Sequence, residues 1–176
     1  MDYYNILISG ISAEIYVSRI IHTRSWIAAE LSDGRYGIAL HDKLQSRERM
    51  FPTFEGLTAR KAAEAVRSWN LLEASEAMAV INAFYNTEER LDKLSARCGF
   101  DKSCTQGFST EGKKVALIGH LVLQPDALKG ASEVYIIERD PKPGDYPDSA
   151  CEYILPESDI VIMTASAAIN LSLIHI

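Results

Sequence analysis

The sequence predicts a mixed α/β fold, in which an α+β amino-terminal part is followed by a parallel sheet. Three observations predict it. Near the amino end, an Asp-Gly pair separates two apolar runs, and two helical patterns follow. Towards the carboxyl end, three short apolar runs alternate with polar segments. Between these regions, the pattern changes from a hairpin with helices to alternating strands and helices, which indicates a change of domain.

The first elements combine a helical spacing with a hairpin signal. Residues 3–21 carry apolar side chains near every third or fourth position, so a helix is expected there. Asp33-Gly34 lies between the apolar runs 25–31 and 35–40. Because this pair favours the positive φ angles of a tight turn, the two runs predict an antiparallel hairpin.

Two helices are expected after the hairpin. Residues 43–56 are charged and contain a proline and a glycine, which predicts a loop. Thr58 can cap a helix that runs through about Trp69, with its alanines on one face. A second helix is expected at about 73–85, with an apolar stripe formed by Ala74, Ala77, Met78, Ile81 and Tyr85.

The remaining chain predicts a linker and then a parallel sheet. Residues 86–112 are polar and contain three glycines, so we expect a linker with one short helix and domains at 1–108 and 109–176. The apolar runs 115–119, 133–138 and 159–164 end beside polar residues or glycine, as parallel strands buried on both faces do.

The end of the chain suggests a shortened sheet. Doubly wound sheets usually have five or more strands, whereas three are recognisable here. Residues 171–176 are nearly all apolar, which is unusual for a solvent-exposed tail. We therefore expect a truncated chain that is prone to aggregation, and the alternative is a small three-stranded domain with a tucked tail.

Bulk composition excludes some classes of function. The net charge is −6 and no basic block occurs, which argues against nucleic-acid binding. No apolar stretch approaches the roughly 18 residues of a membrane span, and charges interrupt the amino terminus where a signal peptide would be apolar. Cys98, Cys104 and Cys151 are an odd number without zinc-site spacing, which favours buried free thiols and a cytoplasmic location.

The strand ends predict a binding site. In open parallel sheets, ligands bind beyond the carboxyl ends of the strands, so Gly119, His120, Glu138, Arg139 and Thr164 are expected to lie together. Only one of the three glycines of a dinucleotide fingerprint is present, so NAD binding is indicated by Glu138 alone, which lies where a ribose-binding acid is expected.

Two further polar features have open interpretations. The loop after Glu138 contains three prolines, Arg139 and Asp145, and it is either a stiffened binding loop or a solvated charged loop. Asn82 lies at helical spacing between apolar residues, so its amide either ties the helix to another backbone segment or points into a ligand cleft.

Scattered motifs along most of the chain resemble one family of bacterial and archaeal proteins, called "putative heavy-metal chelation" proteins. The motifs are Gly56, the helix segment Ala79-Val80-Ile81-Asn82-Ala83, Gly119-His120, Glu138-Arg139, the Pro-Gly-Asp loop, Leu155-Pro156-Glu157-Ser158-Asp159, Thr164 and Asn170. The resemblance implies a domain like the amino-terminal domain of enolase, a Rossmann-like domain and a site in the cleft between them. It also implies handling of a metal or metal chelate, with a link to anaerobic corrinoid biosynthesis and no established reaction.

The leading hypothesis is binding of a heavy metal or a metal-containing small ligand, with His120 as a ligand of a transition metal. The expected site residues are Asn82, Gly119, His120, Glu138, Arg139, Asp145, Thr164 and Asn170. One alternative is an enzyme that uses a nucleotide or adenosyl cofactor, with Glu138 on a ribose, and another is a role in stability or assembly alone. Whether any reaction is catalysed, and whether the protein forms a homodimer, stay open.

Overall fold

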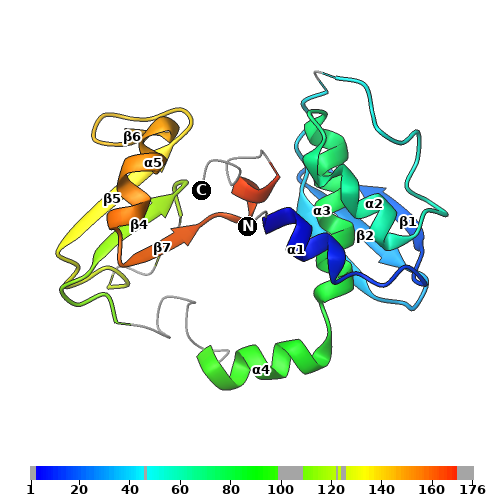
Figure 1. Ribbon diagram of the computed structural model, residues 1–176, viewed down its shortest axis with the longest axis horizontal. Coiled ribbons are helices and arrows are strands. Elements are labelled where there is room, and N and C mark those ends of the chain that lie inside the picture. The colour runs from blue at the N-terminus through cyan, green and yellow to red at the C-terminus, as the bar shows by residue number, and fades with distance from the viewer. Residues whose placement is uncertain (1–2, 46, 99–108, 122, 124–125, 170–176) are drawn as a thin grey trace. The chain divides into compact units, whose positions relative to one another are not determined.

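The structure of the protein is a computed structural model that describes residues 3–45, 47–98, 109–121, 123 and 126–169 (Figure 1). The chain forms two compact units: one contains the residues through Leu91 together with Ala168 and Ile169, and the other runs from Asp92 to Ala167. One unit contains an antiparallel sheet and the other a parallel sheet, which confirms the mixed α/β fold class. In the described part of the chain, no helix is long and apolar enough to cross a membrane.

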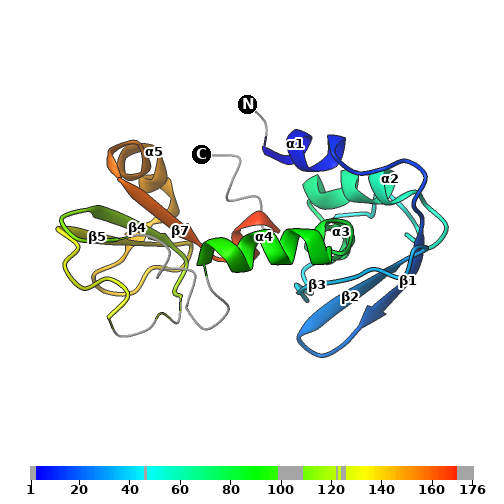
Figure 2. The same cartoon turned by 90° about the horizontal axis from the view of Figure 1, so that it is seen from below.

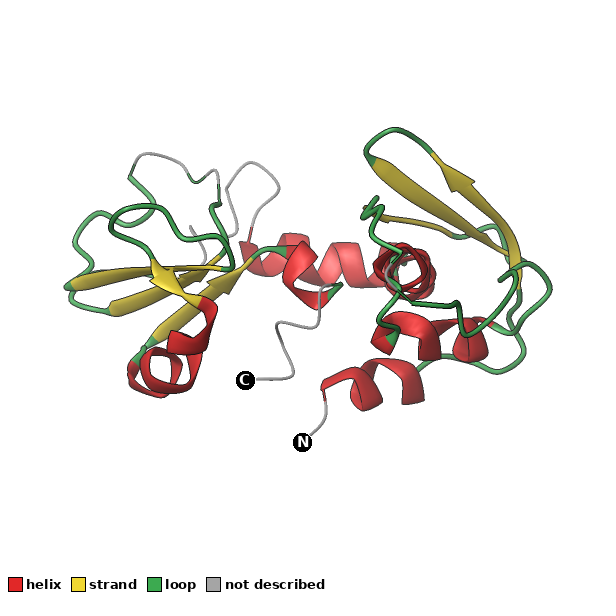
Figure 3. Cartoon of the chain, turned by 90° about the horizontal axis from the view of Figure 1, so that it is seen from above, coloured by secondary structure: helices red, strands yellow, loops and turns green. Residues whose placement is uncertain are grey.

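The first unit is a three-stranded antiparallel sheet with helices on one face (Figures 2 and 3). Its elements are α1 (Tyr3–Ser9), β1 (Val17–His22), β2 (Trp26–Leu31), β3 (Tyr36–Leu40), α2 (Ala59–Ala63), the 3-10 helix η1 (Glu64–Arg67) and α3 (Leu71–Tyr85). The strand order is β1-β2-β3, and α3 packs on β2 and β3. Helix α4 (Glu88–Cys98) follows, as the linker pattern predicted.

The predicted hairpin is confirmed. Strands β2 and β3 pair antiparallel, and the N–H of Leu31 donates to the carbonyl of Arg35 at 2.9 Å to close the loop. Gly34 has a φ of 84°, which is the left-handed conformation that glycine adopts without strain. The guanidinium of Arg35 bonds to Asp33 and holds the pKa of that carboxyl below its usual value.

Close contact between the sheet and α3 depends on Gly37. A Cβ at this position would lie 2.0 Å from the nitrogen of Ala83 and 2.4 Å from the carbonyl oxygen of Ala79, both backbone atoms of α3. The inward residues of β2 are Ile27, Ala29 and Leu31, and all three are buried. A bare glycine in β3 therefore lets the helix backbone approach this apolar layer directly.

The predicted helix at residues 3–21 is wrong beyond Ser9. Helix α1 stops there, and the following residues form strand β1 instead. Gly10 lies under the side chain of Tyr85, whose hydroxyl donates to the carbonyl of Leu7 at 2.7 Å. The β-branched residues from Ile15 onwards suit a strand, so the helical spacing joined two separate elements.

The two later helices are largely as predicted. Thr58 caps α2 by accepting the N–H of Lys61 at 3.2 Å, but the helix tightens into η1 and ends before Trp69, which is exposed. Helix α3 starts at Leu71, where Asn70 is the cap. More residues of α3 are buried than the predicted apolar stripe contains, because the sheet, α2 and the loop before α2 surround the helix.

The second unit is a parallel sheet. Its elements are β4 (Lys114–Ile118), β5 (Glu133–Glu138), β6 (Tyr146–Pro147), the 3-10 helix η3 (Asp148–Ala150), α5 (Cys151–Ile154), the 3-10 helix η4 (Leu155–Glu157), β7 (Ile160–Met163) and the 3-10 helix η5 (Ala165–Ala168). The order is β6-β5-β4-β7, with all pairs parallel, which confirms the three predicted strands. The short β6 and α5 were not predicted.

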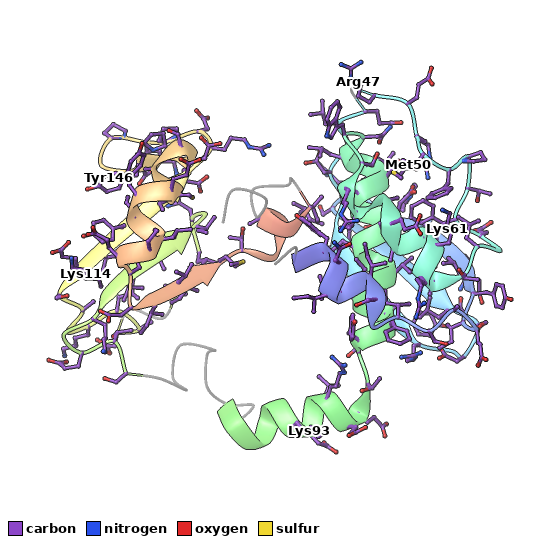
Figure 4. All side chains as sticks on the ribbon, in the orientation of Figure 1. Arg47, Met50, Lys61, Lys93, Lys114 and Tyr146 are labelled. Atoms are coloured by element: carbon purple, nitrogen blue, oxygen red, sulfur yellow. The ribbon has the colours of Figure 1, made fainter. Side chains whose placement is uncertain are left out.

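Strand β4 is the centre of this sheet. Its residues from Val115 to Ile118 are buried, and α5 lies on one face of the sheet (Figure 3). In Figure 4, the label of Lys114 marks the amino-terminal end of β4 and that of Tyr146 marks β6. Cys151 is buried and free, and burial raises the pKa of its thiol.

Candidate functional site

The carboxyl ends of β4, β5 and β7 meet at one edge of the parallel sheet, and Gly119 is the first residue beyond β4. Its φ is 89°, and its N–H donates to the carbonyl of Ile137 at 2.9 Å. A Cβ here would lie 2.7 Å from Cγ2 and 3.0 Å from Oγ1 of Thr164. Gly119 thus turns the chain while Thr164 lies directly against it.

The next residue, His120, connects three segments of this edge. Its backbone N–H donates to Oε1 of Glu138, at the end of β5, over 2.6 Å. Its ring nitrogen Nε2 lies 2.9 Å from Oδ2 of Asp145. The His120 side chain is 42% exposed whereas that of Asp145 is 6% exposed, so a nearly covered carboxylate holds a solvent-accessible imidazole.

The proline-containing loop after β5 folds back to bring Asp145 to the sheet. Lys142 and Asp145 form a tight turn, in which the N–H of Asp145 donates to the carbonyl of Lys142 and the N–H of Lys142 donates to Oδ2 of Asp145, each at 2.9 Å. Gly144 has a φ of 102° within this turn. The short strand β6 then pairs with the end of β5.

These contacts set the electrostatics of the edge. The imidazole of His120 and the backbone N–H of Lys142 lower the pKa of Asp145 below its usual value. Since an ionised carboxylate only accepts hydrogen bonds, Nε2 of His120 carries the proton in this contact. In the neutral ring, Nδ1 is then the nitrogen with a free lone pair, and no described residue hydrogen-bonds to it.

Hydroxyl groups line the β7 side of the edge. Oγ1 of Thr164 lies 2.9 Å from Oγ of Ser166, and the N–H of Thr164 donates to the carbonyl of Ile118 at 3.0 Å. Ser166 was not among the predicted site residues. Its position two residues after a strand-ending threonine is the sequence signal that would have suggested it.

The structure brings together five of the predicted site residues, and the parallel arrangement that this required is confirmed. The five are Gly119, His120, Glu138, Asp145 and Thr164. Arg139 directly follows β5 and is exposed, and Asn170 lies outside the described residues. That these residues bind a ligand stays a prediction.

Asn82 has a structural role in the first unit. Its Nδ2 donates to the carbonyl of Ile38 in β3 at 2.8 Å, and Nδ2 of Asn86 donates to the carbonyl of Tyr36 at 3.1 Å. Of the two interpretations of Asn82, the tie to a backbone segment is the one found. Asn86, one helical turn later, is its partner in this role and was not predicted.

A metal ion held by a protein alone needs three or four donor side chains arranged around it. Among the residues that the structure describes, no three His, Cys, Asp or Glu side chains come together in a way that could hold a metal ion. At the sheet edge, Glu138 bonds to a backbone N–H and Asp145 to an imidazole, so His120 is the remaining nitrogen donor. The edge therefore does not fit a bare metal ion that needs three or four protein ligands.

Comparisons with known proteins agree with this architecture. Two family models, both described as "putative heavy-metal chelation", match residues 4–85 and 108–176. No curated protein matches the chain. One similar solved structure is that of a protein with unknown function from the DUF364 family, from Desulfitobacterium hafniense. Its sequence is 30% identical to this one and the TM-score is 0.74. The match covers 97% of this chain and 68% of that chain. This protein belongs to the DUF364 family.

A second DUF364 structure supports the fold alone. This protein with unknown function from Pyrococcus horikoshii is 21% identical, with a TM-score of 0.68 over 98% of this chain and 70% of that chain. Both family models share one description although they match different parts of the chain. Membership of the DUF364 family thus rests on the relative from Desulfitobacterium hafniense, and the two family models match the two parts of the chain separately.

Proposed function

We propose that this DUF364 protein binds a small metal chelate at the carboxyl edge of its parallel sheet, with His120 as the protein's donor to the metal. The observation that carries the proposal is the 2.9 Å contact between Nε2 of His120 and Asp145. Histidines that bind metals are commonly held by a carboxylate on the other ring nitrogen, which orients the ring and raises its basicity. The description of both matching family models supports the same chemistry.

A chelated metal suits this edge better than a bare ion. One imidazole supplies a single bond, so most of the coordination positions have to be filled by the ligand itself. The hydroxyls of Thr164 and Ser166, close to the same edge, can accept or donate hydrogen bonds to polar groups of such a ligand.

The nucleotide alternative has no comparable support. A phosphate-binding turn presents free backbone N–H groups to the ligand. Here the N–H of Gly119 is bonded to Ile137 and that of His120 to Glu138, which is also the carboxylate assigned to a ribose. The corrinoid link, the enolase-like and Rossmann-like descriptions, the cleft location and the homodimer stay predictions.

The test uses two metal chelates with open coordination positions, aquocobinamide and nickel nitrilotriacetate, titrated into the full chain. Coordination of an imidazole changes the visible spectrum of the corrinoid, and calorimetry reports on both ligands. We expect His120→Ala to weaken binding at least tenfold and Asp145→Asn to weaken it several-fold. The first change removes the donor, whereas the second removes the carboxylate that orients it.

Thermal melts of each variant distinguish a binding role from a structural one. If His120 only shapes the turn, His120→Ala lowers the melting temperature and leaves the affinity for both chelates unchanged, which would contradict the proposal. Lys61→Gln, an exposed change in the other unit, is the control and is expected to bind like the wild type. No binding of either chelate by the wild type would refute the proposal outright.

A further inference from the structure

Two histidines of the first unit lie side by side, far in sequence from His120. His22 is the last residue of β1, and His41 directly follows β3. Their ring centroids are 5.4 Å apart with an angle of 33° between the planes. The two residues flank the start of β2, because Ile27 pairs with His22 and the N–H of His41 donates to the carbonyl of Ser25.

One nitrogen of each ring is held by a protein acceptor. Nε2 of His22 lies 2.8 Å from Oε1 of Glu76, and Nδ1 of His41 lies 2.5 Å from the carbonyl oxygen of Thr23. Both partners accept hydrogen bonds, so both of these nitrogens carry protons. The lone pairs of the neutral rings are therefore on Nδ1 of His22 and Nε2 of His41. This is the arrangement that prepares histidines for metal coordination.

The carboxylate that holds His22 is itself rigidly placed. Glu76 is 3% exposed in α3 and forms a two-pronged ion pair with the guanidinium of Arg49. Its neighbour Glu73 is fully buried and accepts the N–H groups of Met50 and Phe51 at 2.9 Å each. Two buried glutamates thus clamp the loop before α2 against the helix, and His22 bonds to a fixed acceptor.

A cavity of about 250 Å³ lies beside His22. Glu76, Arg49, Glu55 and the aromatic ring of Phe54 are among the residues that line it. His22 is 42% exposed, so solvent and ions reach its ring. The cavity has room for water or a small ligand next to the ring of His22, which lines it.

We propose that His22 and His41 together bind one divalent transition-metal ion, with water or a small ligand in its other positions. Metal–nitrogen bonds of about 2.1 Å place the centroids of two imidazole rings on one ion about 4.5 to 6.5 Å apart, depending on the angle at the metal, and this range includes the observed 5.4 Å. Imidazole pairs suit Cu²⁺, Ni²⁺ and Zn²⁺, and Cu²⁺ binds most tightly of the three. This site is independent of His120 and needs no ready-made chelate.

The test is a titration of the full chain with Cu²⁺, followed by calorimetry and by electron paramagnetic resonance. The wild type is expected to bind one Cu²⁺ at this site with a spectrum that shows two coordinated nitrogens. His22→Gln keeps a donor for Glu76 and His41→Phe keeps a flat ring, so both are designed to preserve the fold. Each is expected to weaken binding at least tenfold and to leave at most one nitrogen in the spectrum.

His120→Ala removes the separate donor at the sheet edge, so the Cu²⁺ that this variant still binds reports on His22 and His41. Unchanged affinity in both His22→Gln and His41→Phe would overturn the proposal, as would loss of all Cu²⁺ binding in His120→Ala alone. Thermal melts with and without Cu²⁺ provide a second readout. Copper is expected to raise the melting temperature of the wild type, and an equal rise in both variants would also overturn it.

Discussion

Gly119 is the residue on which the geometry of the sheet edge depends. Its φ of 89° is unfavourable for any other residue, and the space for a side chain is occupied by Thr164. We expect Gly119→Ala to lower the free energy of unfolding by about 2–4 kcal/mol, through backbone strain and overpacking together. Urea denaturation of the full chain, followed by circular dichroism, measures the loss.

Gly144 offers a matched control for this change. Its φ is 102°, but nothing lies within 4 Å of the position that a Cβ would take. Gly144→Ala therefore introduces strain alone, at a cost of about 1–2 kcal/mol. Combining Gly119→Ala with Thr164→Ala is expected to restore part of the lost stability. If the two glycine variants lose equal stability, the contact with Thr164 has no energetic consequence.

Asp145 links the pH of the solution to the order of its loop. Its folded pKa lies below the unfolded value of about 3.9 because His120 and the N–H of Lys142 stabilise the carboxylate. The stabilisation is therefore complete above about pH 5, where the unfolded carboxyl is also ionised, and is lost as the pH falls through the lowered pKa. Carboxyl NMR titration should show a lowered pKa for Asp145 in the wild type, and His120→Ala should raise it towards the unfolded value. An unchanged pKa would mean that the ring does not interact with Asp145 in solution.

Strand β3 is an edge strand whose free side is covered by Asn82 of α3 and by Asn86, which follows the last residue of that helix. In the hairpin, Leu31 pairs with Arg35 through hydrogen bonds, so Tyr36 and Ile38 direct their carbonyls away from β2. Asn86 and Asn82 donate to these two carbonyls. Unpaired edge groups can recruit a strand from another molecule, and the two amides satisfy them within the chain.

We expect Asn82→Asp and Asn86→Asp to weaken this cover, because a carboxylate of the same shape cannot donate. Each change removes one hydrogen bond and places two acceptors together, which costs about 1–3 kcal/mol. The double variant is expected to form larger species on size-exclusion chromatography and to bind an amyloid dye on heating. Asn5→Asp, at a site that accepts a hydrogen bond from Arg67, is the matched control. A double variant as monodisperse as the control would contradict this role.

Elements whose signals are local were predictable from the sequence. The hairpin followed from Asp33-Gly34, the α2 cap from Thr58 and the parallel strands from continuous apolar runs. The extent of the first helix was not, because its spacing continued across Gly10 into a strand that only pairing with β2 stabilises. Strand β6 has two residues and exists through its pairing with β5, so no local pattern reveals it.

The sheet-edge residues were predictable because parallel strands bring their carboxyl ends together. The contact between His120 and Asp145 was not predictable, since it depends on the turn at Lys142 that folds the loop back. The pair formed by His22 and His41 gave no sequence signal at all. Residues 19 positions apart meet there only because β1 and β3 lie on either side of β2.

For the molecule as a whole, charge and exposed apolar surface act against each other. The net charge is −6 at pH 7 and the isoelectric point is about 5.2. The outer face of the antiparallel sheet carries Trp26, Ile38 and Leu40, which are 52%, 57% and 41% exposed. Because self-repulsion vanishes near the isoelectric point, we expect light scattering to rise near pH 5.2.

Ile38→Lys is expected to reduce that scattering at pH 5.2, because it places a charge in the middle of the exposed face without removing core packing. Val161→Lys adds the same charge to β7 in the other unit, where the side chain is 38% exposed, and therefore controls for net charge. Equal effects of the two variants would show that net charge alone, and not this face, governs self-association.

The order of strands in the parallel sheet has a consequence for synthesis. Its central strand, β4, leaves the ribosome first, β5 and β6 follow on one side, and β7 arrives last on the other. At translation rates of about 5–20 residues per second, β7 is synthesised on the order of seconds after β4, and until then one edge of β4 has no partner strand. During that interval the apolar strand has a single paired side, so the nascent chain is most open to chaperones before Ile160 emerges.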